Sequence, residues 1–198
     1  MPDIQKQIRS ILTVIANQFW RLIATPFRHP PDLANNPALE DDLKWYREFQ
    51  PIHWLDYSVV LKHAENKYKE IRDINDAVDK KCEWLFTIST AASYGLYGLI
   101  QARGVPLLAG IPSLFFFGLA LLGIIRVRMP GVRPTPMAVR SAIKQGEKAP
   151  NITAWLCASH HIAVRELGIV NQWKTVQAKN SLTCVVVATI LAALVFIY

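Results

Sequence analysis

The sequence has very little negative charge in its C-terminal part. Only two acidic residues, Glu147 and Glu166, follow Glu83 in this chain of 198 residues. The first 83 residues carry 12 basic and 13 acidic side chains, whereas the remainder carries 10 basic and 2 acidic ones. The formal net charge of +7 therefore arises beside apolar sequence, which argues against a nucleic-acid-binding domain built on bulk basicity. No sequence-specific contact with nucleic acid is expected.

Charge of either sign is absent from three runs, residues 84–102, 105–125 and 180–198. A helix needs about 20 mostly apolar residues to cross a hydrocarbon core of about 30 Å. The runs reach about that length, and they lack the polar face that a core helix of a soluble protein presents. They exclude an ordinary soluble enzyme and predict three transmembrane helices. The alternative is a soluble protein in which two apolar helices form a buried core.

The first two runs form a helical hairpin, residues 84–125. Only Arg103 and Gly104 separate them, and Pro106 follows, which suits a tight reversal between antiparallel helices. Residues 126–179 carry nine basic side chains against two acidic ones, so the positive-inside rule places this loop and the N-terminus in the cytoplasm. The third span, residues 180–198, then ends in the periplasm. The expected location is the cell inner membrane, with the lipid bilayer as the first partner.

The remaining segments are predicted to be helical or connecting. Residues 1–25 form an amphipathic helix, which lies either in the lipid headgroup layer or against protein of the same chain or another copy. Residues 26–55 are a connector rich in proline and asparagine at its start. Residues 56–83 form a cytoplasmic helix, and residues 126–179 form a basic loop and a second amphipathic helix. The predicted fold is an all-α integral membrane bundle with a transmembrane hairpin, a C-terminal third span and cytoplasmic helical extensions.

A stripe of side chains follows the cytoplasmic helix 56–83 at three-and-four spacing. It packs against another helix of the same chain or forms a seam between protomers. Its members are Tyr57, Leu61, Ala64, Tyr68, Ile71 and Val78, with Asn75 in the remaining position.

Catalytic and metal-binding motifs are absent from the sequence. There is no glycine-rich phosphate loop, no paired Cys-x-x-Cys and no nucleophile elbow, so no enzyme activity, cofactor or metal is predicted. The three cysteines, Cys82, Cys157 and Cys184, form no disulfide framework, and reduced thiols are expected. A lipid-modifying enzyme would need acids, bases or ligands within the membrane, and the apolar runs hold none.

Two sets of residues are candidates for binding and packing. Basic side chains of the cytoplasmic loop and helix are able to contact a phosphate group or a partner protein, although arginines beside a span also arise from topology alone. These are Arg126, Arg128, Arg133, Arg140, His160, His161 and Arg165. Small residues in the spans allow close helix packing. These are Ala91, Gly95, Gly98, Gly110, Gly118, Ala188 and Ala192.

Residues 55–198 resemble small prokaryotic antiphage membrane effectors. The resemblance is carried by the entry into the first span, residues 79–86 (DKKCEWLF), the tight hairpin, the exit rich in Arg and Pro, and residues 171–174 (NQWK) before the last span. The similar groups are the Pycsar transmembrane effectors and SLATT domains, with retron-associated membrane effectors related in role. The N-terminal helix and the connector depart from this pattern, which leaves the trigger open.

The resemblance implies a homo-oligomeric effector for abortive infection. A nucleotide second messenger or a cytoplasmic defence partner would change its assembly, and the spans would then open a pore or otherwise depolarise the inner membrane. The alternative is a non-lytic membrane sensor, inhibitor or scaffold that binds a soluble partner through its cytoplasmic helices.

Overall fold

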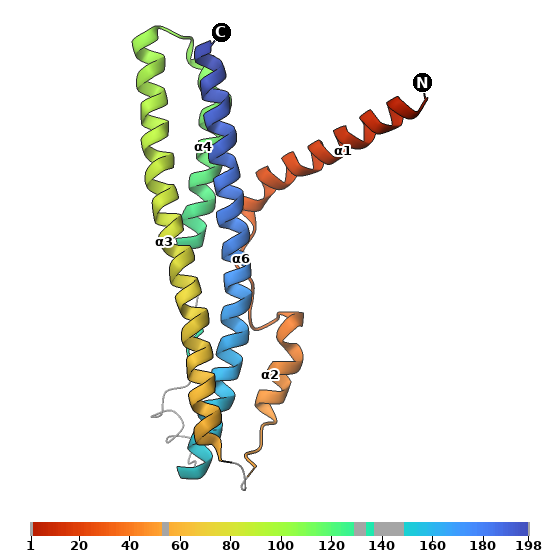
Figure 1. Cartoon of the computed structure of the whole chain (residues 1–198), viewed down its shortest axis with the longest axis vertical. Helices are drawn as coiled ribbons and strands as arrows, with labels where there is room; N and C mark the ends of the chain where they lie inside the picture. Colours follow the sequence, from red (N-terminus) through yellow and green to blue (C-terminus); the bar gives the residue numbers. More distant parts are fainter. Residues whose placement is uncertain (1, 53–55, 129–133, 137–148, 198) are drawn as a thin grey trace. The chain divides into compact units, whose positions relative to one another are not determined.

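A computed structural model describes residues 2–52, 56–128, 134–136 and 149–197, with the backbone alone for residues 2–9, 11 and 149–151. Throughout these residues the chain forms helices and no strand, so the predicted all-α class is confirmed (Figure 1). The elements are α1 (Pro2–Ala24), η1 (Thr25–Phe27), η2 (Pro37–Leu39), α2 (Glu40–Arg47), α3 (Tyr57–Arg103), α4 (Leu107–Arg128) and α6 (Ala149–Ile197).

Contacts within the chain divide it into two compact units. Unit 1 comprises Met1–His29, Asp79–Met129 and Thr175–Tyr198, and unit 2 comprises Pro30–Val78 and Pro130–Lys174. Both α3 and α6 contribute to each unit. Unit 1 thus holds the three charge-free runs. Unit 2 holds most of the charged residues that precede the first of these runs.

The connection between α3 and α4 is set by Gly104. This residue has a φ of 64°, in the left-handed region that glycine adopts without steric cost. Its N–H donates to the carbonyl of Gln101 at 3.3 Å, and the N–H of Val105 donates to the carbonyl of Ile100 at 3.2 Å. This pair of bonds closes α3 as a Schellman motif, after which Pro106 cannot continue the helix.

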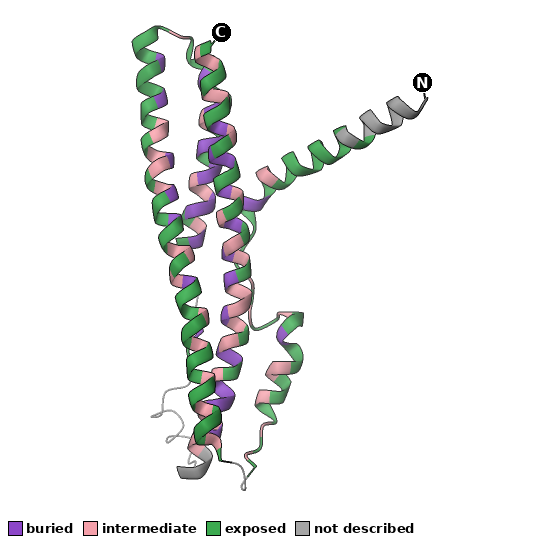
Figure 2. Cartoon of the chain, viewed as in Figure 1, coloured by how far each residue is buried: buried purple, intermediate pink, exposed green. Residues whose placement is uncertain are grey.

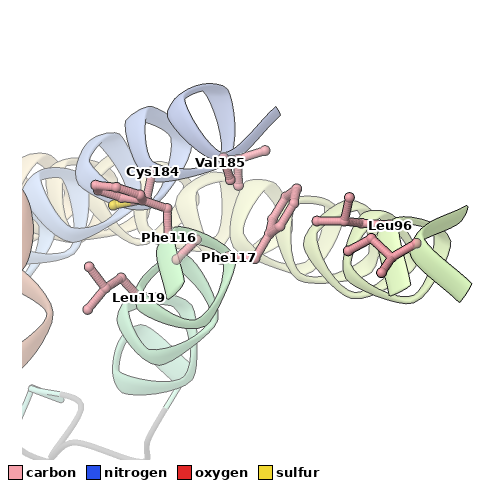
Figure 3. Packing of buried hydrophobic residues seen from close by; sticks show 9 residues of the cluster. Leu96, Phe116, Phe117, Leu119, Cys184 and Val185 are labelled. Carbon is pink, nitrogen blue, oxygen red and sulfur yellow. The ribbon is translucent and has the colours of Figure 1, made fainter. Parts of the chain in front are cut away.

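The core of unit 1 is apolar and is built by three helices. Side chains from α3, α4 and the C-terminal part of α6 meet in one cluster (Figure 3). Its members are Leu96, Ile100, Phe116, Phe117, Leu119, Ala120, Cys184, Val185 and Ala188. The Ser113 hydroxyl, buried within this unit, donates to the carbonyl of Ala188 at 2.6 Å and joins α4 to α6. Such a bond satisfies a polar group that would be costly to bury alone.

In unit 2 the first part of α3 packs in parallel against α6. The Cys157 thiol contacts the carbonyl of Tyr57 at 3.5 Å, and the Asn171 amide donates to the carbonyl of Ile71 at 3.0 Å. In the predicted stripe on residues 57–78, Asn75 is buried and the other six side chains are half-buried. Most of the residues between the stripe positions are exposed (Figure 2). The stripe is therefore an internal face of the chain.

The predicted connector, residues 26–55, contains helical structure. The Asn36 side chain accepts the N–H of Ala38 at 3.0 Å and starts η2, with Pro37 at its first position. The following helix, α2, has three acidic residues in its first turn and Lys44 and Arg47 in its last. Acidic residues at the start of a helix and basic residues at its end interact favourably with the helix dipole. This explains why part of the predicted connector is helical.

Two helices of the described chain are long and apolar enough to cross a membrane. They are α4 and the portion Ile152–Ile197 of α6. The run 84–102, predicted as the first span, lies in α3, which does not reach the same hydropathy. The tyrosine, serine and threonine side chains of this run lower its mean hydropathy, although it carries no charge.

Candidate functional site

The predicted basic binding residues belong to different units. His160, His161 and Arg165 lie on α6 in unit 2, and Arg126 and Arg128 lie at the end of α4 in unit 1. Arg133 and Arg140 lie outside the described residues. Each group therefore has its own surroundings, which are described separately.

In unit 2, two of the predicted binding residues meet one carboxylate. The Arg165 Nε donates to Asp42 Oδ2 at 2.8 Å, and His161 Nε2 lies 3.5 Å from Asp42 Oδ1. The hydrogen bond from Arg165 lowers the pKa of Asp42 below its usual range, and His161 acts in the same direction. Asp42 thus holds α2 against α6. It also contacts Arg165 and His161, which the sequence analysis names as candidates for binding a ligand.

Aromatic rings complete the contact between α2 and α6. Trp45 meets the His161 ring edge-to-face, with centroids 5.5 Å apart. Tyr46 and the following Phe49 meet Trp155 at 5.8 Å and 5.2 Å. Burial in this cluster raises the pKa of Tyr46. Edge-to-face pairs of this kind contribute about 0.5–1.5 kcal/mol each beyond their burial, so the cluster stabilises a helix too short to persist alone.

His160 is used inside unit 2 on a different contact. Its Nδ1 lies 2.8 Å from the carbonyl of Leu156, one turn earlier in α6. Its ring packs edge-to-face on Tyr68 of α3, whose hydroxyl donates to the carbonyl of Pro134 at 3.1 Å. The two adjacent histidines therefore join α6 to two different segments, and no group of three His, Cys, Asp or Glu that suits a metal occurs among the described residues.

We expect the Asp42→Asn variant to expose α2 to proteolysis at neutral pH. Loss of the carboxylate charge weakens the bond to Arg165, and contacts of partly exposed ions are worth about 1 kcal/mol or less. Tryptic cleavage after Lys44 and Arg47 should accelerate by up to about fivefold if it follows the opening equilibrium. Asp41→Asn is the matched control, because Asp41 is exposed in the same helical turn. Equal acceleration in both variants would assign the effect to the helix dipole.

The same contact has a defined pH dependence. Because the folded-state pKa of Asp42 is lowered, its stabilisation is complete above the ordinary carboxyl pKa and is lost as the pH falls through the lower folded value. Fluorescence of Trp45 and Trp155, in a variant whose other four tryptophans are replaced by phenylalanine, follows this loss on acid titration.

In unit 1, Arg128 and Arg126 differ in their surroundings. Arg128 Nη2 donates to Glu83 Oε1 at 2.7 Å and ties α4 to α3, although both side chains are exposed and the pair adds little stability. Arg126 is half-buried, and its Nη1 has no hydrogen-bond partner in the part of the chain that the structure describes. Of the described arginines predicted to bind phosphate, Arg126 is the one that retains a buried donor without such a partner.

The predicted small packing residues divide between inward and outward positions. Gly110 and Ala188 are buried, and a Cβ at Gly110 would overlap the Ile100 side chain of α3. Ala192 is half-buried. Ala91, Gly95 and Gly98 on α3 and Gly118 on α4 are exposed, and the three glycines have open space around them.

A close approach at Gly123 is not among the sequence predictions. A Cβ at this buried residue would lie 2.5 Å from the Ser181 hydroxyl oxygen and 3.8 Å from Gln177 Oε1. Gly123 thus lets α4 meet α6 beside two buried polar side chains. The sequence signal that could have pointed to this face is the three-and-four spacing along α4 of Ser113, Phe116, Ala120, Gly123 and Val127.

Comparison with protein-family models, with curated proteins and with solved structures finds no match to this chain.

Proposed function

We propose that the protein spans a membrane three times, through the run 84–102 of α3, through α4 and through residues 180–198. Three features support this: the length and hydropathy of α4 and α6, the absence of charge in all three runs, and the shared core of the three helices. Residues that face outward from α4 and α6 are large and apolar, among them Leu108, Phe115 and Ile190. In this arrangement they contact acyl chains, and the basic loop lies in the cytoplasm of a prokaryotic cell.

We further propose that the protein is a membrane effector of antiphage defence. The observation that carries this proposal is the outward face of α3, where Ala91, Gly95 and Gly98 are small, uncharged and uncovered. Such a face permits close packing of a second copy without breaking contacts within the first. The defence role itself comes from the resemblance of residues 55–198 to such effectors.

In the proposed mechanism, a nucleotide signal or a partner protein binds on the cytoplasmic side. Arg126 supplies a hydrogen-bond donor suited to phosphate at the membrane boundary. The contact between Asp42 and Arg165 holds α2 against α6, and a partner protein that breaks this contact releases α2. Binding shifts the assembly of spans toward an arrangement that permeabilises the membrane. No step requires catalysis by the protein.

The test is induced expression in bacteria with a dye that reports membrane potential. After phage challenge, cells with the native protein are expected to depolarise. Gly95→Leu and Gly98→Leu place bulk on the proposed contact face and should abolish depolarisation. Gly168→Leu is the matched control, because Gly168 lies in unit 2 with open space around it. Unchanged potential with the native protein would reject the effector, and depolarisation by both α3 variants would reject assembly through this face.

One observation favours a non-lytic sensor, inhibitor or scaffold as the second candidate. Large apolar residues are exposed in unit 2, notably Val59, Val60 and Ile74 on α3. A soluble partner would cover such residues without any change in membrane potential. In the dye experiment this function gives phage protection with no depolarisation.

A further inference from the structure

One face of α1 is apolar, and most of it is uncovered by the described chain. Leu12 and Ile15 are each 58% exposed, and the described side chains from Leu12 to Trp20 are all exposed (Figure 2). In the sequence the same stripe extends toward the N-terminus through Ile11, Ile8 and Ile4. A stripe of this length requires a partner that removes it from water.

The C-terminal end of the same stripe packs on the apolar core of unit 1. The Phe19 ring meets Phe116 of α4 edge-to-face, with centroids 6.1 Å apart. Leu22 and Ile23 are partly buried against the core cluster. The stripe therefore continues without interruption from its packed end to its uncovered part. It thus begins beside the apolar helices that the proposed function places in lipid.

Two side chains of α6 fix the end of α1 at one level of unit 1. The Gln177 amide donates to the carbonyl of Thr25 at 2.8 Å, and the Asn180 amide donates to the carbonyl of Leu22 at 3.0 Å. Asn180 follows Lys179, the last charged residue of the chain, and begins the third apolar run. The C-terminal end of α1 is thus bound at the position on α6 where charged sequence gives way to apolar sequence.

We propose that α1 lies in the headgroup layer of an anionic membrane surface, with the uncovered part of the stripe, from Leu12 to Phe19, toward the acyl chains. This inference rests on the proposed membrane location. Lys6, Arg9 and Arg21 against Asp3 give the helix a positive charge, which attracts anionic lipid and opposes pairing with a second α1. Trp20, 66% exposed, is of the residue type that concentrates at the headgroup level.

The test uses spin labels on the full chain in vesicles of phosphatidylethanolamine and phosphatidylglycerol. Leu12→Cys and Ile15→Cys probe the stripe, Thr13→Cys and Asn17→Cys probe the opposite side, and Ile190→Cys is the reference in the third span. The native cysteines are replaced by alanine, and circular dichroism verifies that this background remains helical. Collision rates are measured with oxygen, which concentrates in lipid, and with a water-soluble nickel chelate.

We expect the ratio of oxygen to chelate collisions to be several-fold higher at Leu12 and Ile15 than at Thr13 and Asn17. Free chelate access at all four α1 sites, with Ile190 in lipid, would overturn this inference and leave the membrane location intact. Chelate access at all five sites would reject the proposed membrane location. Low access of both reagents at Leu12 and Ile15 would show that protein, such as a second copy, covers the stripe and would also overturn the inference.

Discussion

In the Ile190→Arg variant the third span is expected to fail to insert, while the hairpin still anchors the chain in the membrane. Ile190 lies near the middle of the third apolar run, and it is 56% exposed, so its side chain faces away from the core of unit 1. In a bilayer, arginine at the centre of a span costs about 2.5–3.5 kcal/mol, which shifts the insertion equilibrium by roughly 100-fold. In water, the same change at an exposed site alters stability by about 0.5 kcal/mol or less. The periplasmic activity of a reporter enzyme fused after Tyr198 measures the difference.

Val176→Arg is the matched control for this experiment. Val176 lies on the same helix and is 49% exposed, but it precedes the apolar run, between Lys174 and Lys179. We expect this variant to keep the native level of periplasmic reporter activity. Equal reporter activity in the two variants would contradict a third span in residues 180–198.

The second large effect is expected from Gly123→Leu. This glycine is buried, and a Cβ there would already lie 2.5 Å from the Ser181 hydroxyl oxygen. The Ser181 side chain is able to rotate away from one carbon atom, but a leucine side chain forces α4 and α6 apart. Overpacking of this kind costs about 1–3 kcal/mol, and here it also separates the buried Ser113 from its acceptor at Ala188. Thermal unfolding of the detergent-solubilised, monomeric protein should occur several degrees lower.

Gly118→Leu serves as the control in the same helix. No atom of the described residues lies within 4 Å of a Cβ at Gly118, so the leucine side chain enters space that they leave open. Replacing a helical glycine by leucine favours the helix by up to about 1 kcal/mol, and the midpoint should remain constant or rise. If the midpoint of thermal unfolding falls as far in Gly118→Leu as in Gly123→Leu, the loss of stability comes from helix flexibility and not from the contact between α4 and α6 at Gly123.

Local patterns explain why much of the helical structure could be predicted. The stripe from Tyr57 to Val78, with its three-and-four spacing, marks the less exposed side of α3, because burial and helical periodicity are set by the same residues. The turn at Gly104 could be placed for a similar reason, since glycine followed by proline ends a helix whatever it packs against.

The contacts between distant segments could not be predicted. The sequence predicted His161 and Arg165 as basic side chains that contact phosphate or a partner protein. Asp42 lies 123 positions from Arg165 in the chain, yet it contacts both. Nothing local to Asp42 distinguishes it from Asp41. Glycine and alanine present a related difficulty, because an apolar helix carries no polar face to show whether Gly98 or Gly110 points inward.

The separation between Asp42 and Arg165 also determines when α2 can dock. At about 5–20 residues per second, the ribosome completes Arg165 roughly 6–25 s after Asp42. The partners of α1, Gln177 and Asn180, are made later still, since they lie 152 and 158 positions after their acceptors. During synthesis the end of α1 and the aromatic face of α2 therefore both lack their partners on α6. They acquire these partners only when the last quarter of the chain has been translated.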